Sequence, residues 1–200
     1  YFDVFASANE DVSEYWVRSG DANTDFTGGS GQVEAIYEDV FVSPNGTNEI
    51  SIAGTELDPF KTINYAMGRI YQTDDNSITI NLTEGTFSPA SNGEIFPINM
   101  ASNINLIGVG EDVTILDAEQ TYIVMDMEGT YMDYCTNNTI SDLTITGGEA
   151  WFYPDWLGGG MRLSYSDPTI TNVTITNNMA LGGGGMLIQN YSNPTLTGVT

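Results

Sequence analysis

Three stretches decide the fold, TISDLTI (139–145), TITNVTI (169–175) and TLTGVT (195–200), because they repeat one pattern. Their starts lie 30 and then 26 residues apart. A second motif follows the first two copies in the same order, as LGGGMRL (157–163) and GGGGMLI (182–188), offset by 25 residues. A period in this range, carried by several motifs at once, is typical of a solenoid.

The apolar spacing inside each copy predicts a bend. In the first copy the apolar residues are Ile140, Leu143 and Ile145, so the first gap is three residues and the second is two. A straight strand keeps a spacing of two, so the chain must turn within the motif. The residue before the second apolar position is of a kind that tolerates left-handed backbone: Asp142, Asn172 and Gly198.

These short strands, rich in Thr, Ile and Val, bury a face only when successive repeats stack. We therefore predict an all-β, right-handed parallel β-helix, in which parallel strands pair between neighbouring turns. A leucine-rich repeat would need a regular Leu and Asn frame, which the sequence lacks. Earlier segments fit less regular turns, about five in all from residue 77 onward: SITINL (77–82), INLIGVG (104–110), VTILDA (113–118) and YIVMDM (122–127).

The region before the coil predicts a cap. The segment DPFKTINYAMGRIY (58–71) has apolar residues at helical spacing, with Asp58 as a suitable N-cap and Pro59 in the first helical position. We expect a short capping helix at about 59–71 that covers the first turn. We divide the chain into an N-terminal extension of strands and flexible linker (1–37), with an inter-subunit contact as its candidate role, and the parallel β-helix (38–200).

The two ends of the sequence lead to expectations about a longer chain and about assembly. The chain starts at Tyr1 rather than Met, so we expect a processed segment of a longer protein. The last repeat has no lid, so we expect either further repeats of the same chain or head-to-tail self-association, in which N-terminal strands cover the open end of the next subunit. The candidate assembly residues are Tyr1, Phe2, Val4, Phe5, Thr195, Leu196 and Val199.

The charge balance limits the partners. There are 27 Asp and Glu residues against four Lys and Arg and no His, a formal net charge of −23. Such a chain cannot neutralise phosphates, so we predict no nucleic-acid binding. An anionic membrane surface would repel it, and no apolar run is long enough to insert into a bilayer. The lone Cys135 is expected to be a buried, small apolar residue.

Two segments carry a family resemblance. VSPNGTNEISIAGTELDPFKTINYAM (42–67) resembles the opening of secreted bacterial right-handed β-helix proteins of the pectate-lyase-like superfamily. GGGM together with ITNN (175–178) resembles the repeats of chlamydial-type polymorphic outer-membrane proteins. The resemblance implies the parallel β-helix fold and an extracellular or cell-surface location. The fold serves lyases, hydrolases, adhesins and passive stalks alike, so function must be argued from a site.

The sequence favours a role without catalysis. A polysaccharide lyase needs a basic catalytic group, and only Arg162 and Arg69 could lie near the coil. A glycoside hydrolase needs two carboxylates at a suitable separation. The aspartates available for that role form no compact cluster in the sequence: Asp126, Asp133, Asp142, Asp155 and Asp167. We therefore predict no catalytic residues and a structural or adhesive protein, surface-displayed or assembled end to end into a fibre, with a carbohydrate-active enzyme as the alternative.

One inserted segment is the candidate binding surface. EAWFYPDWLGGG (149–160) lies between the two halves of a repeat, and exposed aromatic residues on a loop commonly stack on sugars or anchor a partner protein. We expect it either to bind glycans or surface proteins or to fold back over the flank of the coil. Its candidate binding residues are Trp151, Phe152, Tyr153 and Trp156.

No organic cofactor is indicated, and calcium is the one candidate metal. Oxygen ligands of the kind that Ca²⁺ prefers occur in the pair Asp155 and Asp167 and in the run Asp74, Asp75, Asn76. No loop has the spacing of an EF-hand. The alternative is that these side chains form a solvated acidic face.

Overall fold

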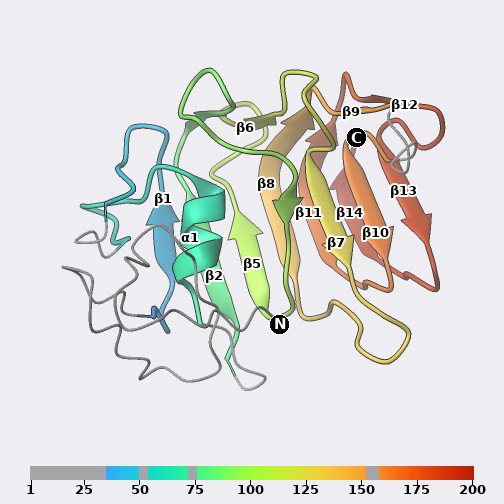
Figure 1. Cartoon of the computed structure of the whole chain (residues 1–200), viewed down its shortest axis with the longest axis horizontal. Helices are drawn as coiled ribbons and strands as arrows, with labels where there is room; N and C mark the ends of the chain where they lie inside the picture. The colour runs from blue at the N-terminus through green and yellow to red at the C-terminus, as the bar shows by residue number, and fades with distance from the viewer. Residues whose placement is uncertain (1–34, 50–53, 72–75, 152–157) are drawn as a thin grey trace, which may run out of the picture.

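The chain winds into a right-handed parallel β-helix of about four turns (Figure 1). This computed structural model describes residues 35–49, 54–71, 76–151 and 158–200. In Figure 1 the chain runs up the rear sheet, crosses at the top and descends in the front sheet while advancing to the right, which is a right-handed path. The predicted fold class is confirmed, with about four turns instead of five. The extension predicted at 1–37 lies almost entirely outside the described residues.

The rear sheet runs the length of the coil. Its path follows the order β1-β2-β5-β8-β11-β14, and two further strands, β3 and β6, pair with each other while β6 also pairs with β8. All of these pairings are parallel. The strands are β1 (Val40–Val42), β2 (Ile78–Leu82), β3 (Gly85–Phe87), β5 (Ile104–Ile107), β6 (Thr114–Asp117), β8 (Thr139–Thr146), β11 (Thr169–Ile175) and β14 (Thr195–Val199).

The front sheet has four parallel strands in the order β13-β10-β7-β4. A third, two-stranded sheet pairs β12 with β9 near the top of Figure 1. These strands are β4 (Ile98–Asn99), β7 (Met125–Glu128), β9 (Glu149–Ala150), β10 (Met161–Ser164), β12 (Met179–Ala180) and β13 (Met186–Gln189).

The repeats stack as the sequence predicts. Ile170 of β11 pairs with Ile140 of β8 on one side and with Leu196 of β14 on the other. The predicted bends are also confirmed, since Asp142, Asn172 and Gly198 have φ of 57°, 51° and 62°. The left-handed residue turns the strand without changing the pairing register. The next apolar position of each copy is again in register, since Val173 pairs with Leu143 on one side and with Val199 on the other.

The core is the interior of the coil. Ile140 and Ile170 are fully buried, as are Met125 and Met161 on the inner face of the front sheet. Burial of such side chains contributes about 1.5–3 kcal/mol each, so stacking of repeats rather than any single strand stabilises the fold. Cys135 is also buried, and burial raises the pKa of its thiol to about 11. The thiol is therefore protonated at neutral pH, as expected of a small apolar residue.

The glycine motifs let neighbouring turns approach closely. A Cβ on Gly160 would lie 2.4 Å from the carbonyl oxygen of Gly185, one turn further on. A Cβ on Gly159 would lie 2.5 Å from the carbonyl oxygen of Met179. Side chains do not fit at these two positions, which explains the glycines of LGGGMRL, whereas the matching Gly185 of GGGGMLI has more room.

The capping helix α1 (Ile63–Arg69) is shorter than predicted. Its N-cap is Thr62, whose side-chain oxygen accepts a hydrogen bond from the Tyr65 amide, so the prediction of Asp58 as N-cap and Pro59 as the first helical residue is wrong. Asp58 instead forms a bridge with Thr55 in a turn, and the chain becomes helical only after Phe60 has bridged β1 at Val42. The apolar face of the predicted helix is buried as expected: Ile63, Ala66, Met67 and Ile70.

A buried carboxylate holds the start of α1. Glu94 is only 1% exposed, and its Oε2 accepts a hydrogen bond of 2.6 Å from the Ile63 amide. Its Oε1 accepts bonds from the amide and the side chain of Asn64. A carboxylate is favourable at a helix N-terminus because the first amides lack partners within the helix. Burial raises the pKa of Glu94, and these hydrogen bonds oppose the rise.

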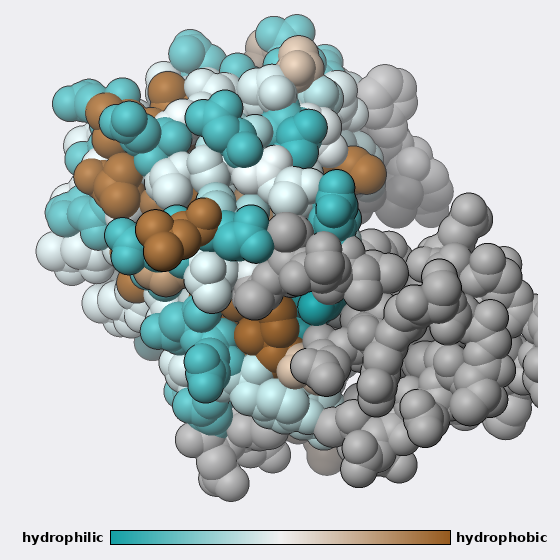
Figure 2. Space-filling view, turned by 90° about the vertical axis from the view of Figure 1, so that its left-hand side faces the viewer, coloured by the Kyte–Doolittle hydropathy of each residue, from teal (hydrophilic) through white to brown (hydrophobic). Residues whose placement is uncertain are grey.

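Figure 2 faces the N-terminal end of the coil, where apolar residues lie in small groups between polar ones.

In the described part of the chain no helix has the length and apolar character needed to cross a membrane.

Candidate functional site

The aromatic segment predicted to bind is described only at its first residue. Trp151 directly follows β9 and is 44% exposed. The other three aromatic residues lie outside the described residues: Phe152, Tyr153 and Trp156. The binding role of this segment therefore stays a prediction.

The predicted calcium pair is described in part. Asp167 is exposed, and its Oδ1 accepts a hydrogen bond of 2.6 Å from the Asn193 amide. Asp155, Asp74 and Asp75 lie outside the described residues. Within the described ranges no group of three or more Asp, Glu, His or Cys side chains could hold a metal ion. Calcium binding at Asp155 and Asp167 stays a prediction.

The C-terminal assembly residues lie on β14, at one edge of the rear sheet. Thr195 and Leu196 are exposed, and Val199 packs partly against the core. The N-terminal assembly residues lie outside the described part of the chain: Tyr1, Phe2, Val4 and Phe5.

The outer side of the front sheet carries polar residues side by side. Alternation along β7 and β10 points their methionines inward, so Asp126, Glu128, Arg162 and Ser164 face outward. Arg162 is paired in register with Asp126, and its Nε donates a hydrogen bond of 2.9 Å to Asp126 Oδ1. Its terminal nitrogen also contacts Asp126 Oδ2, so the pair is bidentate. The pair is largely buried, which fixes both side chains.

Glu128 is placed differently from Asp126. Its side chain is 66% exposed, and its nearest contact with the Arg162 guanidinium is 3.9 Å. The two carboxylates are two residues apart on one face of β7, about 6.6 Å along the strand from the ordinary rise per residue. Asp126 is thus committed to a structural ion pair, whereas Glu128 remains accessible to a ligand.

Three tyrosines line the corner where the front strands end. The ring centroids of Tyr134 and Tyr165 lie 5.7 Å apart, and those of Tyr165 and Tyr191 lie 6.3 Å apart. Each ring comes from a different turn of the coil, because Cys135 bridges Ser166 in parallel and the Ser166 amide donates to Ser192 Oγ. We call this row, Tyr134, Tyr165 and Tyr191, the tyrosine ladder.

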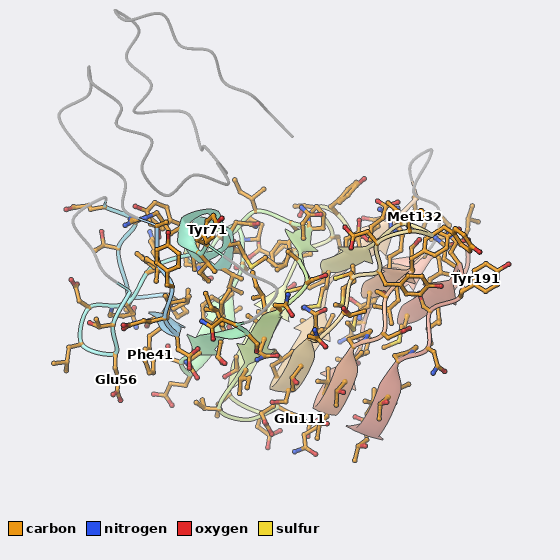
Figure 3. All side chains as sticks on the ribbon, turned by 90° about the horizontal axis from the view of Figure 1, so that it is seen from below. Phe41, Glu56, Tyr71, Glu111, Met132 and Tyr191 are labelled. Carbon is orange, nitrogen blue, oxygen red and sulfur yellow. The ribbon has the colours of Figure 1, made fainter. Side chains whose placement is uncertain are left out.

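The tyrosine ladder is open to solvent. Tyr191 is 78% exposed, and Tyr134 and Tyr165 are half-buried. Met132, in the loop before Tyr134, is 89% exposed, and Figure 3 shows Met132 and Tyr191 on the same side of the coil. Partial burial raises the pKa of the Tyr134 phenol, and the Asp167 carboxylate raises it further, so the phenol stays neutral.

Two rungs of the tyrosine ladder adopt unfavourable backbone conformations. Tyr165 has φ of 49° and Tyr191 has φ of 61°, in the left-handed region. Gly, Asn or Asp would normally occupy such positions, and a bulky residue there costs about 1–2 kcal/mol. Among the described residues, most other non-glycine positions with positive φ hold Asn or Asp, such as Asn172 and Asp142, so tyrosine at these two positions points to a use for the rings.

A pocket adjoins the first rung. Its volume is about 260 Å³, and it is lined by residues that include Ser102, Glu128, Asp133, Tyr134 and Cys135. The Cys135 thiol is protonated and lies next to the Asn138 side chain at 3.4 Å, so it supplies no nucleophile. Two acidic residues and one tyrosine therefore lie around the pocket.

Sequence reasoning missed the tyrosine ladder although a signal was present. The turns SDP (166–168) and SNP (192–194) are each preceded by tyrosine, giving YSDP (165–168) and YSNP (191–194). Tyr134 precedes Cys135, which stacks on Ser166, so no Pro-containing turn marks the first rung.

The fold and this face together define a parallel β-helix protein with an acidic, tyrosine-lined front corner. Residues 45–199 match the sequence model of a family described as "Protein of unknown function (DUF1565)", and the chain belongs to that family. Comparison with the curated proteins found no match.

Solved structures resemble the coil. A point mutant of a pectin methylesterase in complex with a hexasaccharide matches with a TM-score of 0.52 and 11% identity, covering 82% of this chain and 49% of that chain. The pectin methylesterase PemA from Erwinia chrysanthemi matches with a TM-score of 0.49 and 11% identity, covering 74% and 46%. The chain thus spans about half the length of these structures, and likeness at this identity shows the fold alone.

Proposed function

We propose that the chain is a non-enzymatic, extracellular structural or adhesive β-helix protein that holds a polysaccharide along the corner lined by the tyrosine ladder. It is displayed at a cell surface or assembled end to end as a fibre subunit. The observation that carries the proposal is the tyrosine ladder, with one ring per turn and two of the rings held in left-handed backbone.

The ladder suits an extended ligand. Aromatic rings bury apolar surface at little cost in side-chain entropy, and the C–H faces of sugar rings pack against them. Rings from three successive turns are spaced along the coil axis, so a linear chain of sugars lying along the axis can contact all of them. A solenoid repeats the same surface features along its axis, so it is well suited to hold a polymer whose units also repeat.

The acidic composition supports an extracellular setting, where counterions screen the self-repulsion of a chain with net charge −23. The resemblance of residues 42–67 to secreted bacterial β-helix proteins, and of GGGM and ITNN to chlamydial-type surface proteins, points the same way. Calcium held by Asp155 and Asp167 belongs to this proposal as a stabilising ion.

The alternative is a carbohydrate-active β-helix enzyme, a glycoside hydrolase or polysaccharide lyase. Its supporting observation is the pair Asp126 and Glu128, whose separation along β7, about 6.6 Å, falls at the lower limit for inverting glycosidases. Against it, Arg162 occupies both oxygens of Asp126, which leaves that carboxylate poorly placed to take part in proton transfer.

The test is affinity electrophoresis of the purified chain in gels that contain neutral, acidic or amine-bearing polysaccharides. We expect retardation in at least one gel, and loss of retardation in Tyr191→Ala. Tyr37→Ala is the matched control, because Tyr37 is also exposed and also stacks on a tyrosine, Tyr71, at the far end of the coil. Retardation that Tyr37→Ala and Tyr191→Ala reduce equally, or none at all, would contradict the proposal.

The enzymatic alternative has a separate readout. The same polysaccharides, with methyl-esterified pectin added, are incubated with the chain and assayed for new reducing ends, unsaturated products and methanol. We expect none of these products. Product formation that disappears in Glu128→Gln would establish the alternative.

A further inference from the structure

The corner with the tyrosine ladder differs from an ordinary apolar sugar platform in its charge. Two acidic residues, Glu128 and Asp133, line the pocket beside Tyr134. The nearby cation, Arg162, is bound to Asp126 on both oxygens and reaches Glu128 only at 3.9 Å. The carboxylates of Asp126, Glu128 and Asp133 outnumber this cation, so the pocket keeps a net negative charge.

From this arrangement we infer that the bound polysaccharide is cationic, a polymer of amino sugars with free amines, and that the pocket beside Tyr134 receives one of its ammonium groups. The inference rests on the proposed function and adds the charge of the ligand. Carboxylates together with the face of an aromatic ring form the usual environment for an organic ammonium group.

Charge complementarity excludes the opposite choice. A polymer of uronic acids would place its carboxylates against Glu128 and Asp133, and the whole chain carries −23. A neutral polymer would gain the aromatic contacts but form no charge-assisted hydrogen bond with the carboxylates of the pocket. An amine-bearing polymer satisfies both features of the corner.

The exposure of Glu128 and the size of the pocket agree with binding of an amino sugar. The side chain of Glu128 is 66% exposed, so it can meet a ligand without rearrangement. The pocket volume of about 260 Å³ admits one sugar unit with its amine rather than a whole oligomer. The remaining units would extend from Tyr134 towards Tyr165 and Tyr191.

The experiment compares two hexamers of one backbone, the hexamer of glucosamine and the hexamer of N-acetylglucosamine, by isothermal titration at a pH at which the free amines are protonated. We expect the glucosamine hexamer to bind about tenfold more tightly. This preference should shrink as ionic strength rises, because exposed charges are screened over about 10 Å at 0.1 M salt.

Substitutions of the pocket carboxylates test whether the preference for the glucosamine hexamer arises in the pocket. Glu128→Gln and Asp133→Asn should each reduce the affinity for the glucosamine hexamer several-fold and leave that for the acetylated hexamer unchanged. Glu56→Gln is the matched control, an exposed carboxylate at the N-terminal end of the coil (Figure 3). Equal binding of both hexamers, or equal effects of all three variants, overturns the inference.

Failure of the inference is distinguishable from failure of the proposed function. If both hexamers bind equally and Tyr191→Ala abolishes both, the tyrosine ladder binds glycans without regard to charge, and only the inference falls. If neither hexamer binds, and no other polysaccharide retards the chain in electrophoresis, both fall.

Discussion

Single residues in left-handed backbone conformations shape this coil. Asp142, Asn172 and Gly198 turn three successive strands at one register position, and the side chain of Asn172 donates a hydrogen bond of 3.0 Å to Asp142 Oδ1. These bends could be predicted because a gap of three between apolar residues cannot be accommodated in a straight strand. The same conformation at Tyr165 and Tyr191 could not be predicted, since tyrosine is not a residue that favours it.

Substitution at Asn172 tests the bend. Asn172→Ala should lower the free energy of unfolding by about 1–2 kcal/mol, because alanine strains at positive φ and loses the bond to Asp142. Asn172→Gly should cost less, because glycine adopts this conformation freely. Urea titration measures both. Equal stability of the two variants would show that the conformation at this residue is unimportant.

Substitution at Tyr191 separates stability from binding. Tyr191→Asn should leave the free energy of unfolding unchanged or raise it by about 1 kcal/mol, because asparagine tolerates positive φ and the ring is 78% exposed. The same variant should bind oligosaccharide about tenfold more weakly. Thermal unfolding and titration on one preparation check both. A marked loss of stability would mean that the ring serves the fold.

At the scale of elements, the strands could be predicted and the helix cap could not. Parallel strands repeat motifs that are visible in the sequence, so β8, β11 and β14 were located correctly. The start of α1 depends on Glu94, about thirty residues further along the chain, and on Asn48, whose Oδ1 accepts bonds from the amides of Lys61 and Thr62. Contacts so distant in sequence leave no local signal, so Asp58–Pro59 was misread as the helix start.

Glu94 gives the cap a dependence on pH. Burial raises its pKa in the folded chain above the ordinary 4.5, so the folded state binds the proton more tightly than the unfolded state. The stability that this group contributes is therefore present at pH below 4.5 and is lost as pH rises through the folded pKa. Glu94→Gln has no proton to lose, so the stability of the natural chain relative to this variant should fall as the pH rises above 4.5.

Denaturant titrations of both chains at several pH values measure this difference. Glu84→Gln, the same substitution at an exposed position, is the matched control. A difference that rises with pH would mean that the hydrogen bonds from Ile63 and Asn64 to the carboxylate outweigh its burial.

Alanine substitutions at Gly160 and Gly185, which occupy the same place in the two glycine motifs, should differ in their effect on stability. Gly160→Ala should lower the free energy of unfolding by about 1–3 kcal/mol, because its Cβ would meet the Gly185 carbonyl oxygen at 2.4 Å. Gly185→Ala should be tolerated, because its nearest neighbour would be a methyl carbon of Ile175 at 3.5 Å. Urea titration of both tests the close approach of turns. Equal losses would indicate a general need for flexible backbone.

At the scale of the whole molecule, the coil converts a repeat in sequence into a row of side chains on its surface. The fold class followed from the repeats, whereas the candidate site did not. Tyr134 and Tyr165 are 31 residues apart and Tyr165 and Tyr191 are 26 apart, because the connection from β9 to β10 is five residues longer than the matching connection from β12 to β13. Stacking brings them together, so their alignment becomes visible only once the register of the strands is known.

The most direct measurement of the central claim is an NMR titration of the isotope-labelled chain with the oligosaccharide that binds it best. We predict shift changes of backbone amides at the ends of β7, β10 and β13, at Gly129, Tyr165 and Asn190, with the rear sheet unaffected. Shift changes concentrated on the rear strands, or at the N-terminal end around β1, would contradict the account.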